Sequence, residues 1–334
     1  MNLNIDKKEK RGKTEIPIVS ICTITYNHAS FIIDCLQGFL MQKTTFPVEI
    51  LIHDDASTDG TEEIIRDYAA KYPNLIKPLY EQENQWIKGR KGSHAFNFPR
   101  ARGKYIALCE GDDYWTDPYK LQKQVDFLEA NKDFIICLHD TIEVNEKGEF
   151  LKHRSDNFNF INEKKPQIAS EIPVDWFLRT RGNFIHTSSF LFRNIISDLS
   201  FINTGKIISG DMLLLFLLLK NGRAQYLPES MSAYRHHPQG ITKTPRKREK
   251  VLQSYLTLYR LLKTNYNGLY QKEFKLLIAS VKNELLSYRI HHTKFKPTNP
   301  HYYTTWINAI IKRRALNYSL IDILHLFRKS FSQK

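Results

Sequence analysis

Cysteine is scarce in this sequence, and it nowhere forms the C-x-x-C pair typical of zinc and redox sites. The four cysteines all lie in apolar stretches, at Cys22, Cys35, Cys109 and Cys137. Because disulfides are rare in the cytosol, we expect these thiols to be reduced core residues of a cytoplasmic protein. Zinc ligation is the weaker alternative.

Long apolar segments are missing as well. The longest purely apolar run, Met212 to Leu219, is far shorter than the ~20 residues of a membrane-spanning helix. Residues 1–15 are polar and rich in lysine, so we expect a flexible N-terminus and no signal peptide. The sequence also has no Gly-rich phosphate loop of the usual kind and none of the familiar nucleic-acid-binding motifs. We therefore expect no transmembrane helix and no nucleic-acid partner.

The net charge of +14 is concentrated near the C-terminus. Residues 241–334 contain 19 Lys and Arg against 4 Asp and Glu, whereas residues 1–240 contain 30 against 31. Cations such as Lys312 and Arg328 alternate there with apolar residues such as Trp306 and Leu324, which is the composition of an interfacial helix. This pattern predicts peripheral attachment to an anionic membrane surface, on the inner face of the cell membrane. A solvated helical face is the alternative reading.

Apolar runs that alternate with helical patterns indicate an α/β fold. Strands are expected at residues 18–24, 48–53, 105–109, 134–138 and 186–192, a long loop at 81–102, and a buried helix at 212–220. Strands separated by helices predict a mixed, mainly parallel sheet flanked by helices. Two or three amphipathic helices from about residue 246 form a C-terminal helical extension.

Acidic residues follow two of the predicted strands. Asp54 and Asp55 end one of them, and Glu110-Gly111-Asp112-Asp113 ends another. Ligands of open α/β sheets bind at the carboxyl ends of the strands, and carboxylates gathered there repel one another unless a cation joins them. Oxygen ligands of this kind suit Mg²⁺ or Mn²⁺, which in turn suits a diphosphate. The simpler alternative is a pair of solvated, helix-capping loops.

These residues resemble the family 2 glycosyltransferases. The resemblance covers residues 16–138 well, in the stretches Val19-Ser20-Ile21, Thr25-Tyr26-Asn27, Asp54 to Thr61, Ala101 to Ile106 and Glu110 to Asp113. It continues more thinly through Gly210-Asp211 and Tyr234 to His237. It implies the Rossmann-like GT-A fold, with a nucleotide-sugar-binding half at 16–140 and an acceptor-binding, catalytic half at 141–242, followed by the basic helical region 243–334.

The resemblance also implies roles for single residues. Thr25, Tyr26 and Asn27 would line the donor nucleotide, Asp55 would hydrogen-bond its base, and Asp54 would support that loop. Asp112 and Asp113 would hold the ribose and a diphosphate-bound Mn²⁺ or Mg²⁺. Glu110 replaces the first Asp of the family's usual pattern and is expected near the donor. Asp211 would be the catalytic base.

Three of these assignments leave alternatives open. Asp211 precedes an apolar helix, where an Asp is most often an N-cap, and both roles can coexist. His236 is expected as a further metal ligand, with His237 as the alternative. The family's frequent Ala-Arg-Asn loop has no clean counterpart, so Arg100 is expected to contact the donor, with Arg90 and Lys91 as alternatives.

The sequence thus predicts an inverting glycosyltransferase. It would move a sugar from a UDP-, dTDP- or GDP-sugar to a hydroxyl of a glycan or lipid-linked acceptor, in cell-surface polysaccharide assembly. A sugar nucleotidyltransferase is one alternative, which pyrophosphate release from a nucleoside triphosphate would reveal. A non-catalytic, membrane-tethered scaffold that binds nucleotide sugars is the other.

Overall fold

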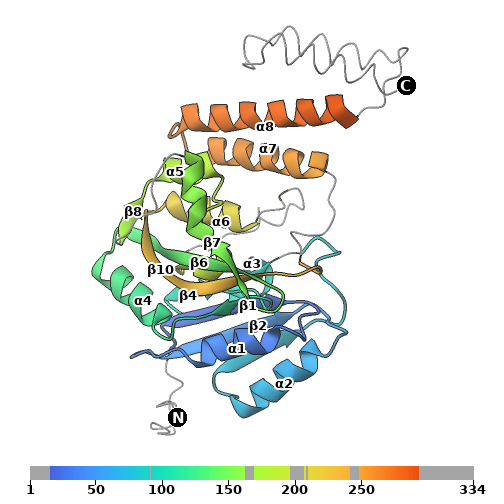
Figure 1. Cartoon of the computed structure of the whole chain (residues 1–334). Coiled ribbons are helices and arrows are strands. Elements are labelled where there is room, and N and C mark those ends of the chain that lie inside the picture. The colour runs from blue at the N-terminus through green and yellow to red at the C-terminus, as the bar shows by residue number, and fades with distance from the viewer. Residues whose placement is uncertain are drawn as a thin grey trace. The chain divides into compact units, whose positions relative to one another are not determined.

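The structure, a computed structural model, describes residues 16–90, 92–161, 169–195, 207, 210–240 and 248–292, with the backbone alone at 158–161 and 290–292. The chain divides into two compact units (Figure 1). The α/β unit contains the described residues from 16 to 195 and from 210 to 240. The helical unit contains residue 207 and residues 248–292.

The α/β unit is built on one large sheet. Its strands are β1 (Val19–Thr25), β2 (Val48–Asp54), β3 (Ile76–Tyr80), β4 (Tyr105–Leu108), β5 (Tyr114–Trp115), β6 (Phe134–Asn145), β7 (Phe150–His153), β8 (Ser170–Ile172), β9 (Leu191–Arg193) and β10 (Arg223–His236). Its α-helices are α1 (Ile32–Leu40), α2 (Thr61–Lys71), α3 (Ser93–Phe96), α4 (Lys120–Ala130), α5 (Val174–Thr180) and α6 (Gly210–Leu219). Short 3-10 helices span Phe98–Arg100, Arg154–Ile161 and Thr187–Ser189.

The strand order is β3-β2-β1-β4-β9-β6-β10-β5, with β7 paired to β6 and β8 paired to β10. Strands β3, β2, β1 and β4 are parallel to their neighbours, and so are β6 and β10. β9 lies antiparallel between β4 and β6. The sheet is therefore mixed, as predicted, and its all-parallel part is the half that carries both acidic loops.

A shared apolar core holds this half together. α1 buries Cys35, Leu36 and Phe39 against the cluster that also contains Ile21 of β1 and Ile50 of β2. Burying one large aliphatic or aromatic side chain contributes about 1.5–3 kcal/mol. The rigid core therefore sets where the loops at the carboxyl ends of β1, β2 and β4 meet.

The sequence-based strand assignment was least accurate in the second half. The strand predicted at 186–192 is a 3-10 turn at Thr187–Ser189 followed by the short β9. The extent of the 14-residue strand β10 was not predicted. The strand contains Pro228 and shifts register between Leu227 and Ser232, and this interrupts the two-residue alternation by which a strand is recognised.

Two amphipathic helices form the described part of the helical unit, as predicted. α7 (Arg248–Asn265) buries Leu252, Tyr259 and Leu262, and α8 (Gln271–His292) buries Phe274 and Val281. Within the described ranges, no helix combines the length and apolar character needed to cross a bilayer. The predicted flexible N-terminus (1–15) and the cations of the predicted membrane surface (312–314, 328–329) lie outside the described residues. Membrane attachment therefore stays a prediction.

Candidate active site

Three loops that leave the carboxyl ends of parallel strands meet at one edge of the sheet. The backbone N–H of Asp55, after β2, donates to the carbonyl of Thr25 at the end of β1 over 3.0 Å. The N–H of Gly111, after β4, donates to the carbonyl of Ile24 over 2.9 Å. The two acidic stretches therefore flank the end of β1, as the parallel pairing predicts.

The turn after β1 is locked to the loop after β2. Asn27 adopts a positive φ of 55°, its N–H donates to the hydroxyl of Ser57, and its side-chain oxygen accepts from the N–H of Thr58. This geometry leaves the Tyr26 ring 43% exposed at the edge of the sheet. Asn27 is thus a structural support, whereas Tyr26 presents an aromatic face on which a planar base could stack.

The neighbouring carboxylates after β2 have different surroundings. Asp54 is fully buried, and its carboxylate accepts from the hydroxyl of Ser57 at 2.5 Å and from the Ser57 N–H at 3.2 Å. Burial raises the pKa of Asp54 despite these bonds. Asp55 accepts from the N–H groups of Gln85 and Trp86, at 2.6 and 3.1 Å. Asp54 therefore supports its own loop, while Asp55 orders the start of the 81–102 segment.

Arg100 does not have the contacts expected of a donor-binding residue. Its guanidinium donates to the carbonyls of Lys77 and Ile52, each at 2.8 Å, and to the side-chain oxygen of Asn97. Burial lowers the pKa of this side chain. The N–H groups of the guanidinium thus already donate to backbone carbonyls of β2 and β3, so we no longer expect Arg100 to contact the donor. Of the two alternatives, Arg90 lies over the Phe96 ring and Lys91 is outside the described residues.

The acidic loop after β4 gathers three carboxyl groups whose oxygens lie within 4.8 Å of one another, those of Glu110, Asp112 and Asp113. Burial, together with the charges of Asp112 and Asp211, raises the pKa of Glu110 to about 8. Burial and the charge of Asp112 hold the pKa of Asp113 well above its ordinary value. These groups therefore resist joint ionisation while no cation is present.

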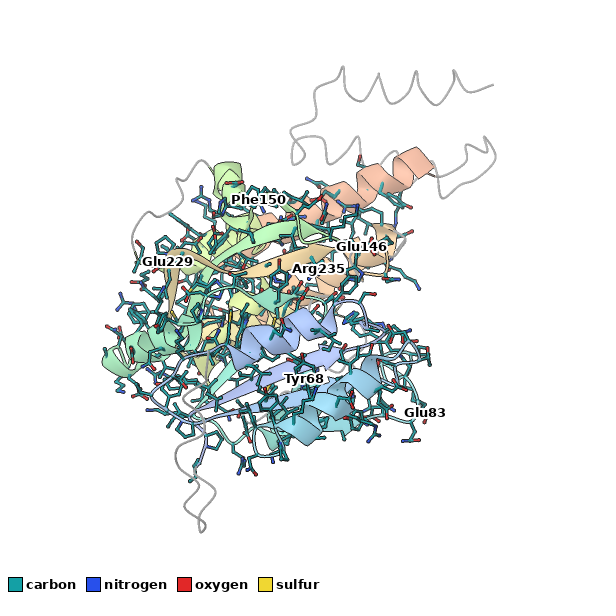
Figure 2. All side chains as sticks on the ribbon, turned by 60° about the horizontal axis from the view of Figure 1, so that its bottom comes forward. Tyr68, Glu83, Glu146, Phe150, Glu229 and Arg235 are labelled. Carbon is teal, nitrogen blue, oxygen red and sulfur yellow. The ribbon has the colours of Figure 1, made fainter. Side chains whose placement is uncertain are left out.

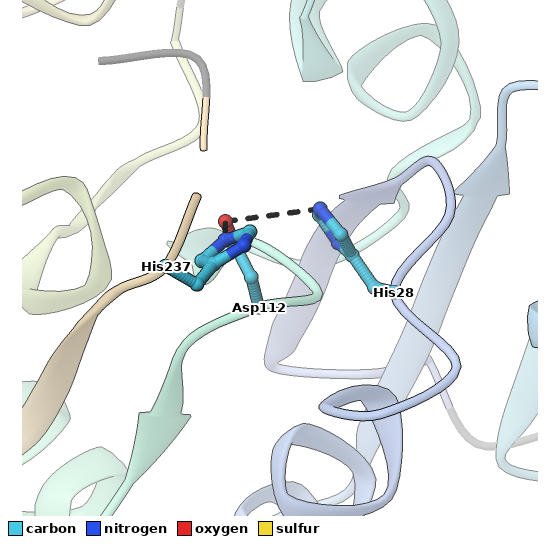
Figure 3. Close-up of side chains that lie close together, drawn as sticks. All are labelled: His28, Asp112 and His237. Atoms are coloured by element: carbon cyan, nitrogen blue, oxygen red, sulfur yellow. Dashed lines mark hydrogen bonds and ion pairs between the residues drawn. The ribbon is translucent and has the colours of Figure 1, made fainter. Parts of the chain in front are cut away.

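Two histidines face Asp112, and neither was predicted as its principal partner. His237 places Nε2 at 2.9 Å from Oδ2 of Asp112, and His28 places Nε2 at 3.7 Å from the same oxygen (Figure 3). Burial tends to raise the pKa of Asp112, but the bond to His237 and the charge of His28 outweigh it and lower the pKa overall. Asp112 is therefore the carboxylate of this loop that stays ionised.

The structure gives His236 a different partner from the expected one. Its Nε2 bonds to Glu143 at 2.7 Å, on the neighbouring strand β6, and not to the acidic loop. His236 is the last residue of β10 and His237 follows the strand, and the two side chains have different partners. His237, which the sequence offered as the alternative, is the one that joins Asp112.

Asp211 lies in the first turn of α6, as its sequence context predicts. Burial raises the pKa of its carboxyl group, although bonds from backbone N–H groups of the first turn act against this. The hydroxyl of Thr187 donates to Oδ2 over 3.5 Å, and the charge of Arg154 reaches the same group. Protein atoms surround the carboxyl group, although the residue as a whole is exposed to solvent. A carboxyl group with a raised pKa on a residue that solvent reaches has the properties of a general base.

Arg235 braces the acidic loop, and nothing in the sequence indicated this role. Its backbone N–H donates to Oδ1 of Asp113 over 2.9 Å, and its guanidinium donates to the backbone carbonyl of Asp112 over 3.2 Å. The same guanidinium reaches Asp34 of α1 at 2.6 Å and the carbonyl of Glu146 at 3.0 Å. Figure 2 labels Arg235 and Glu146, which lie near each other in that view. One buried residue of β10 thus contacts three other segments, the acidic loop, α1 and the turn at Glu146.

His186 is a further residue that the sequence did not single out. Its ring stacks on Tyr234 with centroids 4.2 Å apart, and Nδ1 lies 3.6 Å from Oδ2 of Asp113. Burial, assisted by the charge of Arg154, lowers the pKa of His186 to about 3. The imidazole is therefore neutral at physiological pH and adds no charge beside the acidic loop.

The donor groups present fit a divalent cation. Asp112 belongs to both sets of three ligand atoms found among the described residues, one with Glu110 and Asp113 and the other with His28 and His237. Its Oδ1 is buried and has no hydrogen-bond partner in the described part of the chain. A buried, ionised oxygen without a partner is costly unless a cation completes its environment.

Comparisons with known proteins show which proteins this chain is similar to. A protein of Mycobacterium tuberculosis is 39% identical over 229 residues, which are 67% of this chain and 60% of that protein. The putative teichuronic acid biosynthesis glycosyltransferase TuaG of Bacillus subtilis is 36% identical over 112 residues, which are 34% of this chain and 42% of that protein. The chain thus spans about 60% of the Mycobacterium relative and less of the Bacillus one.

Among solved structures, Staphylococcus aureus TarS 1–349 in complex with UDP-GlcNAc superposes with a TM-score of 0.59 and 17% identity, covering 94% of this chain and 91% of that one. This likeness confirms the predicted GT-A-type α/β fold. The sequence profile of Glycosyl transferase family 2 matches residues 20–199, more than half of the chain. The chain therefore belongs to glycosyl transferase family 2.

Proposed function

We propose that this protein transfers a sugar from a nucleotide-diphosphate donor to an acceptor hydroxyl, with inversion at the sugar carbon and with a divalent cation. The observation that carries the proposal is the pairing of two unlike carboxylates. Asp112 is kept ionised beside His237, whereas the exposed Asp211 has a raised pKa and lies close enough for its charge to act on Glu110. A cation ligand and a separate base are the two groups that this reaction needs.

The donor would lie along the ends of β1, β2 and β4. Tyr26 offers an exposed ring for the base, and Asp55 lies at the same edge of the sheet as Thr25. We propose Asp112 and His237 as residues that hold the cation, because their donor atoms already converge. When bound, Mn²⁺ or Mg²⁺ would neutralise the negative charge that develops on the leaving diphosphate.

Asp211 would act on the acceptor. Its carboxylate would take the proton from the acceptor hydroxyl while that oxygen forms the new bond to the sugar carbon. The bond from the same carbon to the diphosphate oxygen breaks on the opposite face, so configuration inverts and no covalent enzyme intermediate forms. The N–H groups in the N-terminal turn of α6 favour the ionised form of this carboxylate and so oppose the effect of burial on its pKa.

For the acceptor, we propose a glycan or a lipid-linked glycan of a cell-surface polysaccharide. The Bacillus relative bears a name that assigns it to teichuronic acid biosynthesis, and this supports the class of product without identifying it. For the donor, UDP-sugars are the first to test, since the structure similar to this chain contains UDP-GlcNAc. dTDP- and GDP-sugars come next.

A donor panel tests the proposal. The full chain is incubated with each UDP-, dTDP- and GDP-sugar, with Mn²⁺, Mg²⁺ or EDTA, and release of the nucleoside diphosphate is measured. We expect release from one donor class in the presence of a cation, and its loss in Asp211→Asn. Asp175→Asn is the matched control, because Asp175 is also an acid in the first turn of a helix, α5, and should leave turnover unchanged. Equal rates in wild type and Asp211→Asn would contradict the mechanism.

A further inference from the structure

His28 lies in the turn between β1 and α1 and has no part in the mechanism described so far. Its Nε2 and that of His237 both point at Oδ2 of Asp112, from 3.7 and 2.9 Å (Figure 3). The two rings are nearly perpendicular, with centroids 5.9 Å apart. One nitrogen of each histidine and one carboxylate oxygen all lie within 4.8 Å of one another. Three possible ligand atoms of one cation are therefore already close together.

The second ring nitrogen of each histidine, Nδ1, lies beside an oxygen atom, as it does in metal-bound histidines. Nδ1 of His28 lies 3.2 Å from the hydroxyl of Thr25, and Nδ1 of His237 lies 3.3 Å from the side-chain oxygen of Gln239. A metal-ligating histidine almost always gives its other ring nitrogen to an oxygen partner, which orients the ring and frees the facing nitrogen for the metal. Both rings have that arrangement, and their Nε2 atoms face the same point.

The spacing is close to that of a loaded site. Ligand atoms about 2.1 Å from a cation and at right angles to each other are about 3 Å apart. His237 already meets this distance from Asp112, and His28 would need to approach by less than 1 Å. The Nδ1 of His28 is also close to Gly111, where an added Cβ would lie 3.1 Å from that nitrogen and 2.6 Å from the Thr25 hydroxyl. The acidic loop therefore packs directly against the ring and its partner.

The alternative set consists of oxygen ligands alone. The backbone N–H of Arg235 occupies Oδ1 of Asp113, whereas Oδ2 has no hydrogen-bond partner among the described residues and belongs to a side chain that is 1% exposed. Glu110 carries one methylene more than the Asp usual at its position in the family. The three-atom set that contains both histidines needs neither of these carboxylates.

We propose that His28 is a second imidazole ligand of the cation, so that Asp112, His28 and His237 form a two-histidine, one-carboxylate face. This inference rests on the proposed function, which supplies the cation and the diphosphate. The remaining positions of the coordination sphere would take diphosphate oxygens and water. Imidazole nitrogen favours transition metals, whereas Mg²⁺ prefers a shell made of oxygen. The site should therefore select Mn²⁺ or Co²⁺ over Mg²⁺.

Metal affinity tests this without any sugar transfer. Binding of MnCl₂ to the full chain in the presence of UDP is measured by calorimetry, with Mg²⁺ as competitor. We expect His28→Ala to weaken Mn²⁺ binding by about 10–100-fold, the range seen when the support of a metal site is removed. His28→Asp, which restores an oxygen ligand, should narrow the preference for Mn²⁺ over Mg²⁺. His236→Ala is the matched control and should leave Mn²⁺ affinity unchanged.

Electron spin-echo spectroscopy of bound Mn²⁺ counts directly coordinated nitrogens and separates a ligand from a structural residue. We expect two imidazole nitrogens in the wild type and one each in His28→Ala and His237→Ala. A single nitrogen in the wild type, or an unchanged Mn²⁺ affinity and spectrum in His28→Ala while Asp112→Asn abolishes binding, would overturn the role of His28 and leave the proposed function standing. If the wild type bound no Mn²⁺ with any nucleoside diphosphate, both would fail.

Discussion

Nε2 of His237 lies 2.9 Å from Oδ2 of Asp112, although the two residues are separated by 125 positions in the chain. The contact joins the loop after β4 to the residue that follows β10, two segments that the antiparallel pairing of β5 with β10 also brings together. A cation bound here would therefore link the early and late parts of the α/β unit. The predictions that follow test this link and the groups around it.

Gly111 should be essential for the acidic loop. A Cβ at this position would lie 2.6 Å from the Thr25 hydroxyl and 2.7 Å from the Thr25 Cβ, which is closer than such contacts allow. We expect Gly111→Ala to displace the loop and to weaken Mn²⁺–UDP binding by at least about 10-fold. Gly89→Ala is a contrasting variant, because an added Cβ there meets no neighbour within 4 Å. The only strain in that variant comes from the positive φ of the backbone at this position. Equal binding in both variants and wild type would show that the close packing is not required.

Asp211→Asn should lower turnover by about 10²- to 10⁴-fold, the usual contribution of a general base, with little change in donor affinity. Because burial raises the pKa of Asp211, the wild-type rate should fall with decreasing pH at a pH above the ordinary range of an aspartate. The amide cannot titrate, so this acid limb should be absent from the residual activity of the variant. Steady-state kinetics between pH 4 and 9, with a donor titration, measures both effects. An identical acid limb in the variant would assign it to another group.

Arg235→Lys should loosen the acidic loop even though the charge is kept. A lysine has no planar fork with which to reach Asp34 and the carbonyls of Asp112 and Glu146 together. We expect a lower melting temperature and weaker Mn²⁺–UDP binding. Both effects should be smaller in Asp34→Asn, because that variant leaves the bonds from Arg235 to the two carbonyls intact. Arg66→Lys is the control, since the exposed Arg66 side chain pairs with Glu62 of the same helix and lies over the Tyr80 ring. A Lys variant that binds and melts like wild type would exclude the bracing role.

Lys120 should make the stability of the α/β unit depend on pH. Its ammonium group is fully buried, 2.8 Å from the Gln124 side-chain oxygen and 4.1 Å above the Trp115 ring, and burial lowers its pKa to about 7. The unfolded chain keeps this proton up to about pH 10, so between pH 7 and 10 it binds more protons than the folded chain. Unfolding free energy should therefore rise with pH in this window, by at most about 1.4 kcal/mol per unit.

Chemical denaturation of wild type and Lys120→Met at pH 7, 8 and 9 isolates this contribution. The difference in unfolding free energy between the two proteins should change across the window, because methionine carries no proton. Lys132→Met, at an exposed position, is the control variant. A constant difference for Lys120→Met would mean that Lys120 does not titrate there.

The sequence predicted the meeting of the acidic loops because that meeting follows from local patterns. Apolar runs identify strands, parallel pairing brings their carboxyl ends to one edge, and Asp55 and Gly111 do bond to the end of β1. His236 and His237 were not separable in the same way. They are neighbours at the end of a strand whose register was unknown, and a shift by one residue exchanges their faces.

The residues that support the site could not be predicted from the sequence, for a different reason. Arg235 meets Asp34 and Glu146, and His28 meets Asp112, over long separations that only the packed sheet defines. Arg100 was chosen because it is a cation in the 81–102 loop, where a residue that contacts the donor was expected. Its partners, however, are backbone carbonyls of β2 and β3, which no side-chain pattern reveals.

The central claim is that Asp112 serves a cation and a diphosphate together. Calorimetric titration of UDP, dTDP and GDP into the full chain, once with Mn²⁺ and once with EDTA, tests it most directly. The account predicts that Mn²⁺ tightens binding of one of these nucleotides at least about 10-fold, and that Asp112→Asn removes the gain. Equal affinities with Mn²⁺ and with EDTA for all three nucleotides, or a gain that survives in Asp112→Asn, would contradict it.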